Sequence, residues 1–271
     1  MALAGEEVAL VARGEHLRAI RERGLRVDSI KGDFVARPWL ASDDPSEVGV
    51  VDAVILGVKA WQVTEAAEAM RPMVGPNTFV VPVQNGVEAP SELSAVLGAR
   101  HVVGGLGQIV SFIVGPGHIR HGGAEPLVKL GELDNRPSTR VERLRQALVN
   151  AGVTAEVPPD IQSALWTKLL LIAPWSGVGA VTRASAGVWR KAPGTRQMVG
   201  KLMQEVLAVA RALDVSLSGD AVDSAMALVD SLPADATASM QRDIMEGRPS
   251  ELEYQNGSVV RLGREADVPT P

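Results

Sequence analysis

Lys168 is the residue whose surroundings in the sequence most clearly suggest a chemical role. It is the only charged residue between Asp160 and Arg183. At helical spacing it shares one stripe with the apolar residues Ile161, Leu165 and Ile172. An ammonium on such a stripe loses hydration, which lowers its pKa and makes it a better proton donor near neutral pH. The pattern alone also fits a structural lysine that reaches from the edge of the core to solvent.

Two polar side chains come at the ends of predicted strands. Lys59 ends the apolar run 52–59, and Asn85 follows the run 78–83 and begins an Asn-Gly turn. Taken singly, each fits an ordinary turn or surface position. Because open α/β sheets bind ligands beyond the carboxyl ends of their parallel strands, the two together indicate one ligand edge.

Arg13 ends the predicted strand 7–13, at a position that could determine which cofactor binds. If this is the second strand of a dinucleotide-binding sheet, an acidic residue here would bind the ribose hydroxyls. An arginine suits a 2′-phosphate instead, which favours NADP(H). The alternative is a surface arginine at the start of a loop.

Glu251 lies in the segment "RPSELEYQNG" (248–257). Ser250 and Glu253 have the spacing of a helix capping box, which would place Glu251 in the first helical turn. A carboxylate is favoured there by the helix dipole, so a structural role explains Glu251 on its own. A role towards a ligand requires further evidence.

The elements that must position these side chains form two groups. Up to residue 157 strands and helices alternate, with a hairpin predicted over 25–41 and antiparallel strands over 101–133. Pro158–Pro159 breaks both kinds of element, and beyond it every periodic segment is helical. We expect an α/β, Rossmann-like doubly wound sheet in residues 1–157, followed by an all-helical domain in residues 158–271.

The composition excludes several classes of protein. The net charge of −5 argues against a nucleic-acid partner, and the absence of cysteine excludes disulfides and thiolate zinc sites. The four histidines show no helical metal spacing, so no metal is expected. The start of the chain has no basic region typical of a signal peptide, and the apolar stretch near "LLLIAPW" is far short of a membrane span. We therefore expect a cytoplasmic protein without a membrane segment.

The order of several motifs along the whole chain resembles the ketopantoate reductase family, whose members reduce 2-dehydropantoate with NADPH. The motifs are "VARGEHL", "VKAWQV", "PVQNGV", "ALWTKL" and the run "SMQRDIMEGRPSELEYQNG". The resemblance implies that Lys168 is the general acid towards the substrate carbonyl oxygen. It also implies that Glu251 and Ser239 bind the substrate, at its hydroxyl end and its carboxylate respectively.

On the cofactor side, the resemblance implies that Arg13 meets the 2′-phosphate of NADP(H) and that Lys59 lies beside the cofactor. Asn85 would belong to both the nicotinamide and the substrate pocket. The expected reaction transfers hydride to C2 of a 2-oxo acid while the ammonium supplies a proton.

The sequence departs from the family pattern after the lysine. The family has asparagine four residues on and an Asn-Pro pair soon after, whereas this chain has Ile172 and then Ser176, with the proline at 174. We expect Ser176 on the substrate side. Because an alkyl group replaces a polar one, a 2-oxo acid or carbonyl compound other than ketopantoate is an open alternative.

The ends of the chain also differ from the family pattern. The sequence contains neither the opening strand nor the GxGxxG turn of the family, and it stops before an expected last helix. We therefore expect an N-terminally incomplete dinucleotide domain and a C-terminally short helical domain. A non-catalytic binding module of the same fold and another reductase, such as a 3-hydroxy acid dehydrogenase, remain alternatives, although "SELEYQNG" argues against the latter. A homodimer is possible.

Overall fold

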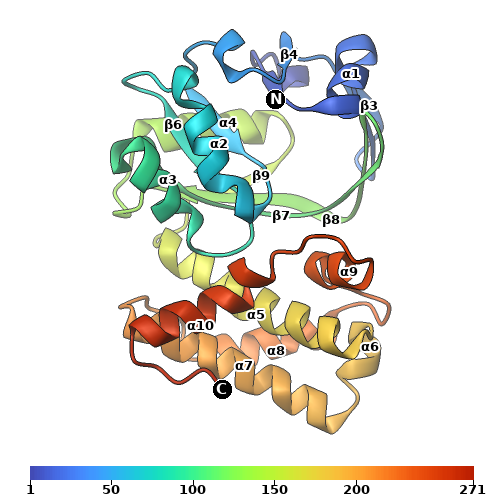
Figure 1. The fold of residues 1–271 in the computed structure, drawn as a ribbon, viewed down its shortest axis with the longest axis vertical. Coiled ribbons are helices and arrows are strands. Elements are labelled where there is room, and N and C mark those ends of the chain that lie inside the picture. The colour runs from blue at the N-terminus through green and yellow to red at the C-terminus, as the bar shows by residue number, and fades with distance from the viewer. The chain divides into compact units, whose positions relative to one another are not determined.

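The structure is a computed structural model that describes the backbone of residues 1–271 and the side chains of all residues except Ala124. Its contacts divide the chain into two compact units (Figure 1). Unit 1 comprises Met1–Val58, Gln62–Gln84 and Pro90–Ile161, and unit 2 comprises Lys59–Trp61, Asn85–Ala89 and Gln162–Pro271. Two short segments from the first half of the chain therefore belong to unit 2.

Unit 1 is the α/β part of the molecule. Its strands are β1 (Ala9–Val11), β2 (Leu25–Ser29), β3 (Phe34–Ala36), β4 (Leu40–Ser42), β5 (Ala53–Leu56), β6 (Phe79–Pro82), β7 (Gly104–Gly115), β8 (His118–Gly131) and β9 (Thr154–Glu156). Its helices are α1 (Gly14–Arg23), α2 (Val63–Ala69), most of α3 (Ala89–Leu97) and α4 (Thr139–Asn150). The expected alternation of strand and helix is confirmed.

The strands pair in three groups. β1 pairs with β4 and β5 pairs with β6, both in parallel. The largest sheet has the order β3-β2-β8-β7, with β9 also paired to β8. Within it β2 and β3 form the expected hairpin, and β7 and β8 form the expected antiparallel pair. The strand β9 was not anticipated, because three residues carry no readable period.

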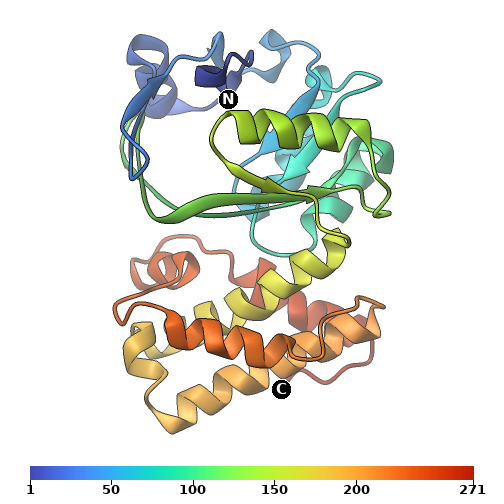
Figure 2. The same ribbon diagram turned by 180° about the vertical axis from the view of Figure 1, so that it is seen from behind.

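The core of unit 1 is formed by side chains of β6, β8, β9 and α4 together with Val103, and Figure 2 shows α4 in front of the strands of this unit. Helix α4 buries its predicted apolar stripe of Val141, Leu144 and Leu148. A Cβ on Gly105 of β7 would lie 2.4 Å from the side chain of Val81. The glycine-rich segment "GGLGQI" (104–109) therefore serves close strand packing.

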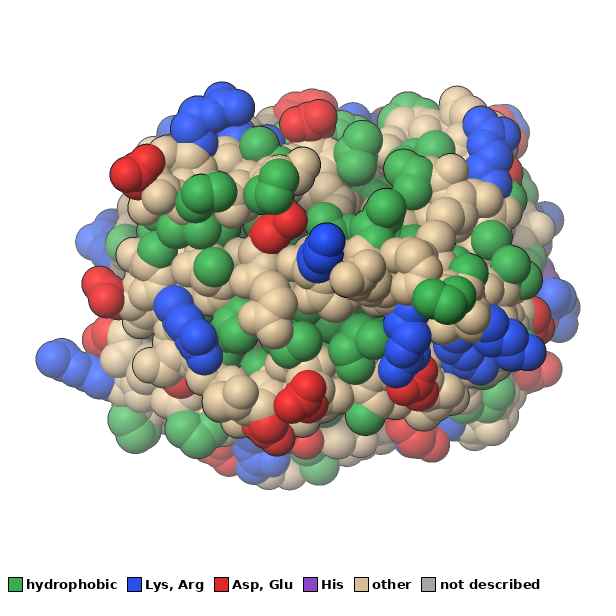
Figure 3. Space-filling model, turned by 90° about the horizontal axis from the view of Figure 1, so that it is seen from below, with side chains coloured by type: hydrophobic (Ala, Val, Ile, Leu, Met, Phe, Trp, Pro, Cys, Tyr) green, Lys and Arg blue, Asp and Glu red, His purple; other side chains and the backbone are tan. Residues whose placement is uncertain are grey.

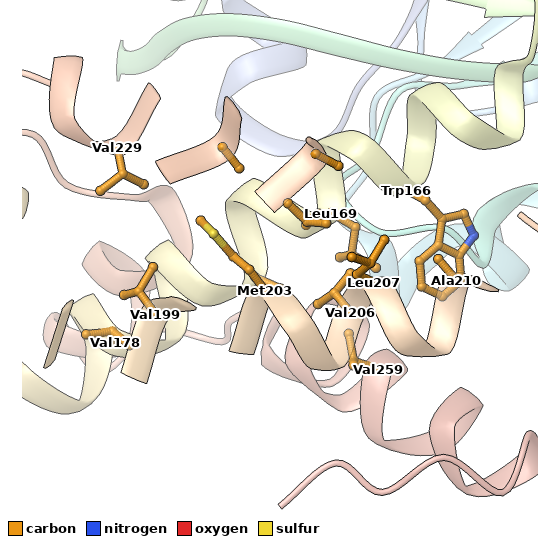
Figure 4. Packing of buried hydrophobic residues seen from close by; sticks show 14 of the residues in the cluster. Trp166, Leu169, Val178, Val199, Met203, Val206, Leu207, Ala210, Val229 and Val259 are labelled. Atoms are coloured by element: carbon orange, nitrogen blue, oxygen red, sulfur yellow. The ribbon is translucent and has the colours of Figure 1, made fainter. Parts of the chain in front are cut away.

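Unit 2 is helical. It contains α5 (Ile161–Thr182, apart from its first residue), α6 (Ala186–Trp189), α7 (Pro193–Ala212), α8 (Ala221–Ser231), α9 (Ser239–Met245), the 3₁₀ turn η6 (Leu252–Tyr254) and α10 (Asn256–Glu265). As Figure 4 shows, Trp166 and Leu169 of α5 pack with Met203, Val206 and Leu207 of α7 and with Val259 of α10. This core fixes the face of α5 that carries Lys168.

Helix α5 is longer than the sequence analysis predicted. The apolar segment 161–173 predicted a helix that ends before Pro174. The helix instead continues through this proline to Thr182. A proline removes one backbone donor from a helix interior, and tight packing on the core can offset that cost. Among the described residues, α5 is the one helix whose length and hydropathy would suit a membrane span. Of its most apolar 18-residue stretch, 56% is buried inside the protein. Core helices meet the same criterion, so it is weak evidence for a span.

Figure 3 shows one face of the molecule in space-filling form. Basic, acidic and apolar side chains are intermixed across it. Mixed charge of this kind gives only weak long-range attraction to a polyanion.

Candidate active site

Lys168 is half-buried in the middle of α5. Burial lowers the pKa of its ammonium from 10.5 to about 8, while the charge of Glu251 acts in the opposite direction and raises it. At neutral pH the group is therefore protonated but releases its proton far more readily than a surface lysine. This is the electrostatic state that the sequence pattern suggested.

Glu251 immediately precedes the turn η6 and is only 5% exposed. Its Oε1 accepts a hydrogen bond from the backbone N–H of Ala60 at 3.2 Å, and its Oε2 accepts one from Nδ2 of Asn85 at 3.3 Å. The predicted capping box is wrong. Residues 252–254 form a 3₁₀ turn, and Glu253 pairs at 3.5 Å with Arg261 on α10.

Lys59 and Asn85 come together as their positions after the strands predicted. Leu56 and Pro82 are register partners at the ends of the parallel strands β5 and β6, and each of the two side chains lies three residues beyond. Both lie in segments that belong to unit 2. The turn after Asn85 is tight: Gly86 has a φ of 106°, and a Cβ there would lie 2.6 Å from the carbonyl oxygen of Tyr254. A glycine is therefore required for Asn85 to reach Glu251.

Lys59 is held by an ion pair. Its Nζ lies 3.0 Å from Oδ2 of Asp243 on α9 and 5.8 Å from the ring centre of Trp61. Burial tends to raise the pKa of Asp243, but hydrogen bonds from Lys59 and Arg248 hold it below its usual value. The carboxylate of Asp243 thus remains ionised and fixes both basic side chains.

Two further polar residues belong to this region: Gln255, which was not identified from the sequence, and Ser176, which was expected on the substrate side. Gln255 is 1% exposed, and its Nε2 lies 3.5 Å from Oε2 of Glu251. Ser176 is 2% exposed, and its hydroxyl lies 3.0 Å from Oε1 of Gln255 and 2.5 Å from the carbonyl oxygen of Ile172. No sequence signal links positions 176 and 255, although Gln255 lies within the motif "RPSELEYQNG".

The two remaining predicted site residues, Ser239 and Arg13, are not part of this hydrogen-bonded group. Ser239 is exposed at the first residue of α9, one helical turn before Asp243 and on the same face. Arg13 belongs to unit 1, precedes α1 and pairs at 3.2 Å with Glu65, both side chains being largely exposed. The described contacts therefore join Lys168, Asn85, Glu251 and Ser176, with Gln255 between the last two, and they do not include Ser239 or Arg13.

This arrangement can supply a proton in a site of low polarity. The Lys168 ammonium is the donor, and the Glu251 carboxylate tunes it through charge. The amide of Asn85 is fixed beside that carboxylate. A lysine of this kind can protonate a carbonyl oxygen on which negative charge develops.

Comparisons with known proteins identify the family of the chain. The family model described as "Ketopantoate reductase PanE/ApbA" matches residues 1–135, and the model of the C-terminal part of the same family matches residues 160–271. The chain belongs to the ketopantoate reductase family. It is 32% identical to the 2-dehydropantoate 2-reductase of Mesorhizobium japonicum, over 100% of this chain and 88% of that protein.

Solved structures of the family have the same fold. A PanE/ApbA family ketopantoate reductase from Ralstonia eutropha matches with a TM-score of 0.88 and 31% identity, covering 99% of this chain and 87% of that one. A D-mandelate dehydrogenase with NADH and anilino(oxo)acetate matches with a TM-score of 0.89, 99% and 88% coverage and 22% identity. At that identity the second likeness concerns the fold alone.

Proposed function

We propose that the protein reduces a 2-oxo acid to the corresponding 2-hydroxy acid with NADPH, in the manner of a 2-dehydropantoate 2-reductase. The observation that carries this proposal is the Lys168 ammonium, whose pKa is lowered to about 8 beside the charge of Glu251. Membership of an oxidoreductase family supports it. With 2-dehydropantoate as substrate, the reaction would belong to pantothenate biosynthesis.

The residues at the ends of parallel strands fit a nicotinamide dinucleotide. Lys59 follows β5, Asn85 follows β6, and Arg13 follows β1, which pairs in parallel with β4. Open α/β sheets bind such ligands beyond the carboxyl ends of their parallel strands. Bound NADPH would supply the hydride, and Arg13 would favour its 2′-phosphate over the free hydroxyl of NADH.

The chain's own side chains account for the remaining steps. Lys168 orients the carbonyl of the substrate and donates a proton to its oxygen as charge develops there. Glu251 and Asn85 bind the polar end of the substrate, and Ser239 contacts its carboxylate. These assignments follow the family pattern and the burial of Glu251.

Steady-state kinetics of the full gene product would test the proposal. We expect NADPH oxidation with 2-dehydropantoate or another 2-oxo acid, and a loss of at least about a hundredfold in kcat for Lys168→Ala. Lys201→Ala, which changes an exposed lysine on α7 of the same unit, is the matched control and should keep full activity. Absence of turnover with every 2-oxo acid would reject the reductase function, and full activity of Lys168→Ala would reject the role of the lysine.

One observation favours a second substrate. Ile172 lies one turn beyond Lys168 on α5 and is half-buried, so an alkyl side chain stands beside the ammonium. A 2-oxo acid with an apolar substituent fits this position better than one with a hydroxyl. Comparing kcat/KM for 2-dehydropantoate with that for branched 2-oxo acids would decide between them, because an unpaired buried hydroxyl costs about 1–3 kcal/mol.

A further inference from the structure

A buried amide connects the candidate active site to the core helix α5. Gln255 lies between η6 and α10 and is almost fully enclosed. One end of its side chain meets Oε2 of Glu251, and the other meets the hydroxyl of Ser176. Neither Gln255 nor Ser176 has a part in the steps proposed above beyond the general substrate side expected for Ser176.

Counting protons fixes the direction of these hydrogen bonds. A serine hydroxyl has one proton, and two acceptors lie within reach of Ser176: Oε1 of Gln255 and the carbonyl oxygen of Ile172. If the proton pointed at Ile172, the amide of Gln255 would have to donate to Ser176 and turn its oxygen towards Glu251. Two acceptor oxygens, Oε1 of Gln255 and Oε2 of Glu251, would then face each other.

The other neighbours of Glu251 decide between these arrangements. Ala60 and Asn85 both donate to its carboxylate, which is the pattern that stabilises an ionised group. The consistent chain therefore runs from the Ser176 hydroxyl to Oε1 of Gln255, and from Nε2 of Gln255 to Oε2 of Glu251. In this arrangement the amide oxygen and the amide nitrogen of Gln255 each have a partner of the right kind.

We infer that Gln255, oriented by Ser176, is a positioning residue that holds the ionised carboxylate of Glu251 in place beside Lys168. Gln255 touches neither substrate nor cofactor in this role, and Ser176 acts through Gln255. The inference deepens the proposed function, since it explains how the charge that tunes the proton donor is fixed.

The consequence for Lys168 has a definite sign. Burial depresses the pKa of Lys168, and Glu251 is the charged group that opposes this effect. If Gln255 is lost, the carboxylate of Glu251 gains freedom to turn away from Lys168. This change weakens its effect, so the pKa of Lys168 should fall further.

Direct titration of Lys168 tests this without relying on activity. The chain has six lysines, so selective ¹³C labelling of lysine gives few NMR signals, and that of Lys168 is the one lost in Lys168→Arg. In Gln255→Met we expect its pKa to fall by about 0.5–1 unit. Ser176→Ala should shift it in the same direction by less, and this milder variant serves if Gln255→Met does not fold.

Gln241→Met is the matched control. Gln241 is a fully buried glutamine of α9 whose Nε2 binds the carbonyl oxygen of Ala184. Its replacement should lower stability but leave the titration of Lys168 where it is. If Lys168 titrates in both Gln255→Met and Ser176→Ala as in the wild type, or at higher pH, the inference is wrong.

The two proposals fail in different ways. If no 2-oxo acid is reduced while Gln255→Met still shifts Lys168, the proposed function is wrong and the positioning role stands. If reduction occurs and the basic limb of the kcat/KM profile is the same in Gln255→Met as in the wild type, the positioning role is wrong and the function stands.

Discussion

Replacing Glu251 with glutamine should make Lys168 a weaker base and narrow the pH range of activity. Glu251 is the charge that raises the pKa of Lys168, and a nearby opposite charge is worth about one unit or more. Glu251→Gln keeps the size of the side chain and removes its charge, and it turns one of the two acceptor oxygens into a donor group. The pKa of Lys168 should therefore fall from about 8 to about 7 or lower.

The expected kinetic effect follows from the protonated fraction of Lys168. At pH 7.5 that fraction would drop from roughly three quarters to roughly one quarter, which lowers kcat/KM about threefold from proton supply alone. The loss of kcat/KM should diminish towards pH 6, where Lys168 is protonated in both the wild type and Glu251→Gln. Any loss of substrate binding adds a factor that is constant with pH, so the shape of the profile isolates the charge.

The assay is the pH dependence of kcat/KM for NADPH-dependent reduction, with Glu253→Gln as the control. Glu253 lies two residues away and is exposed, with a side-chain exposure of 75%. Its replacement should leave the profile unchanged. A basic limb that stays in place in Glu251→Gln, or that moves to higher pH, would refute the electrostatic reasoning.

Three further changes have defined outcomes. Lys168→Met should raise the free energy of unfolding at pH 7 by up to about 3 kcal/mol in urea titrations, because it removes a charge whose burial lowers its pKa from 10.5 to about 8. The gain should shrink between pH 8 and 10.5, where the wild type becomes more stable as its folded lysine loses the proton first; a less stable variant at pH 7 would contradict this. Gly86→Ala should cost about 2 kcal/mol or more in thermal unfolding, since its φ is 106° and its Cβ would strike the carbonyl of Tyr254, whereas Gly219→Ala, with open space around it, should be nearly neutral. Arg13→Ala should raise the KM for NADPH about tenfold or more and leave that for NADH unchanged, and equal effects on both would remove the 2′-phosphate assignment.

Much of the site could be predicted because its chemistry leaves local traces. Lys168 stands out as one charge in a long apolar segment, and Lys59 and Asn85 stand out because they follow strands. Such positions can be recognised in the sequence because burial and sheet geometry determine the types of the residues next to them in the chain.

Other features depend on contacts between distant residues and could not be predicted. Ser176 and Gln255 meet across 79 positions of sequence, and neither residue type is unusual where it occurs. The turn at 252–254 overrides a regular capping signal because the backbone there must present Glu251 to Ala60. The continuation of α5 through Pro174 likewise reflects tertiary packing that prevails over local preference.

The division of the chain has a consequence for recombination between relatives. The backbone passes from one unit to the other at five places, since Lys59–Trp61 and Asn85–Ala89 belong with the helices. A chimaeric gene joined between residues 135 and 160, where the two family models separate, would take Glu251 from one parent and its donors Ala60 and Asn85 from the other. Functional hybrids should therefore require that the short segments around 60 and 85 be inherited together with the second half of the gene.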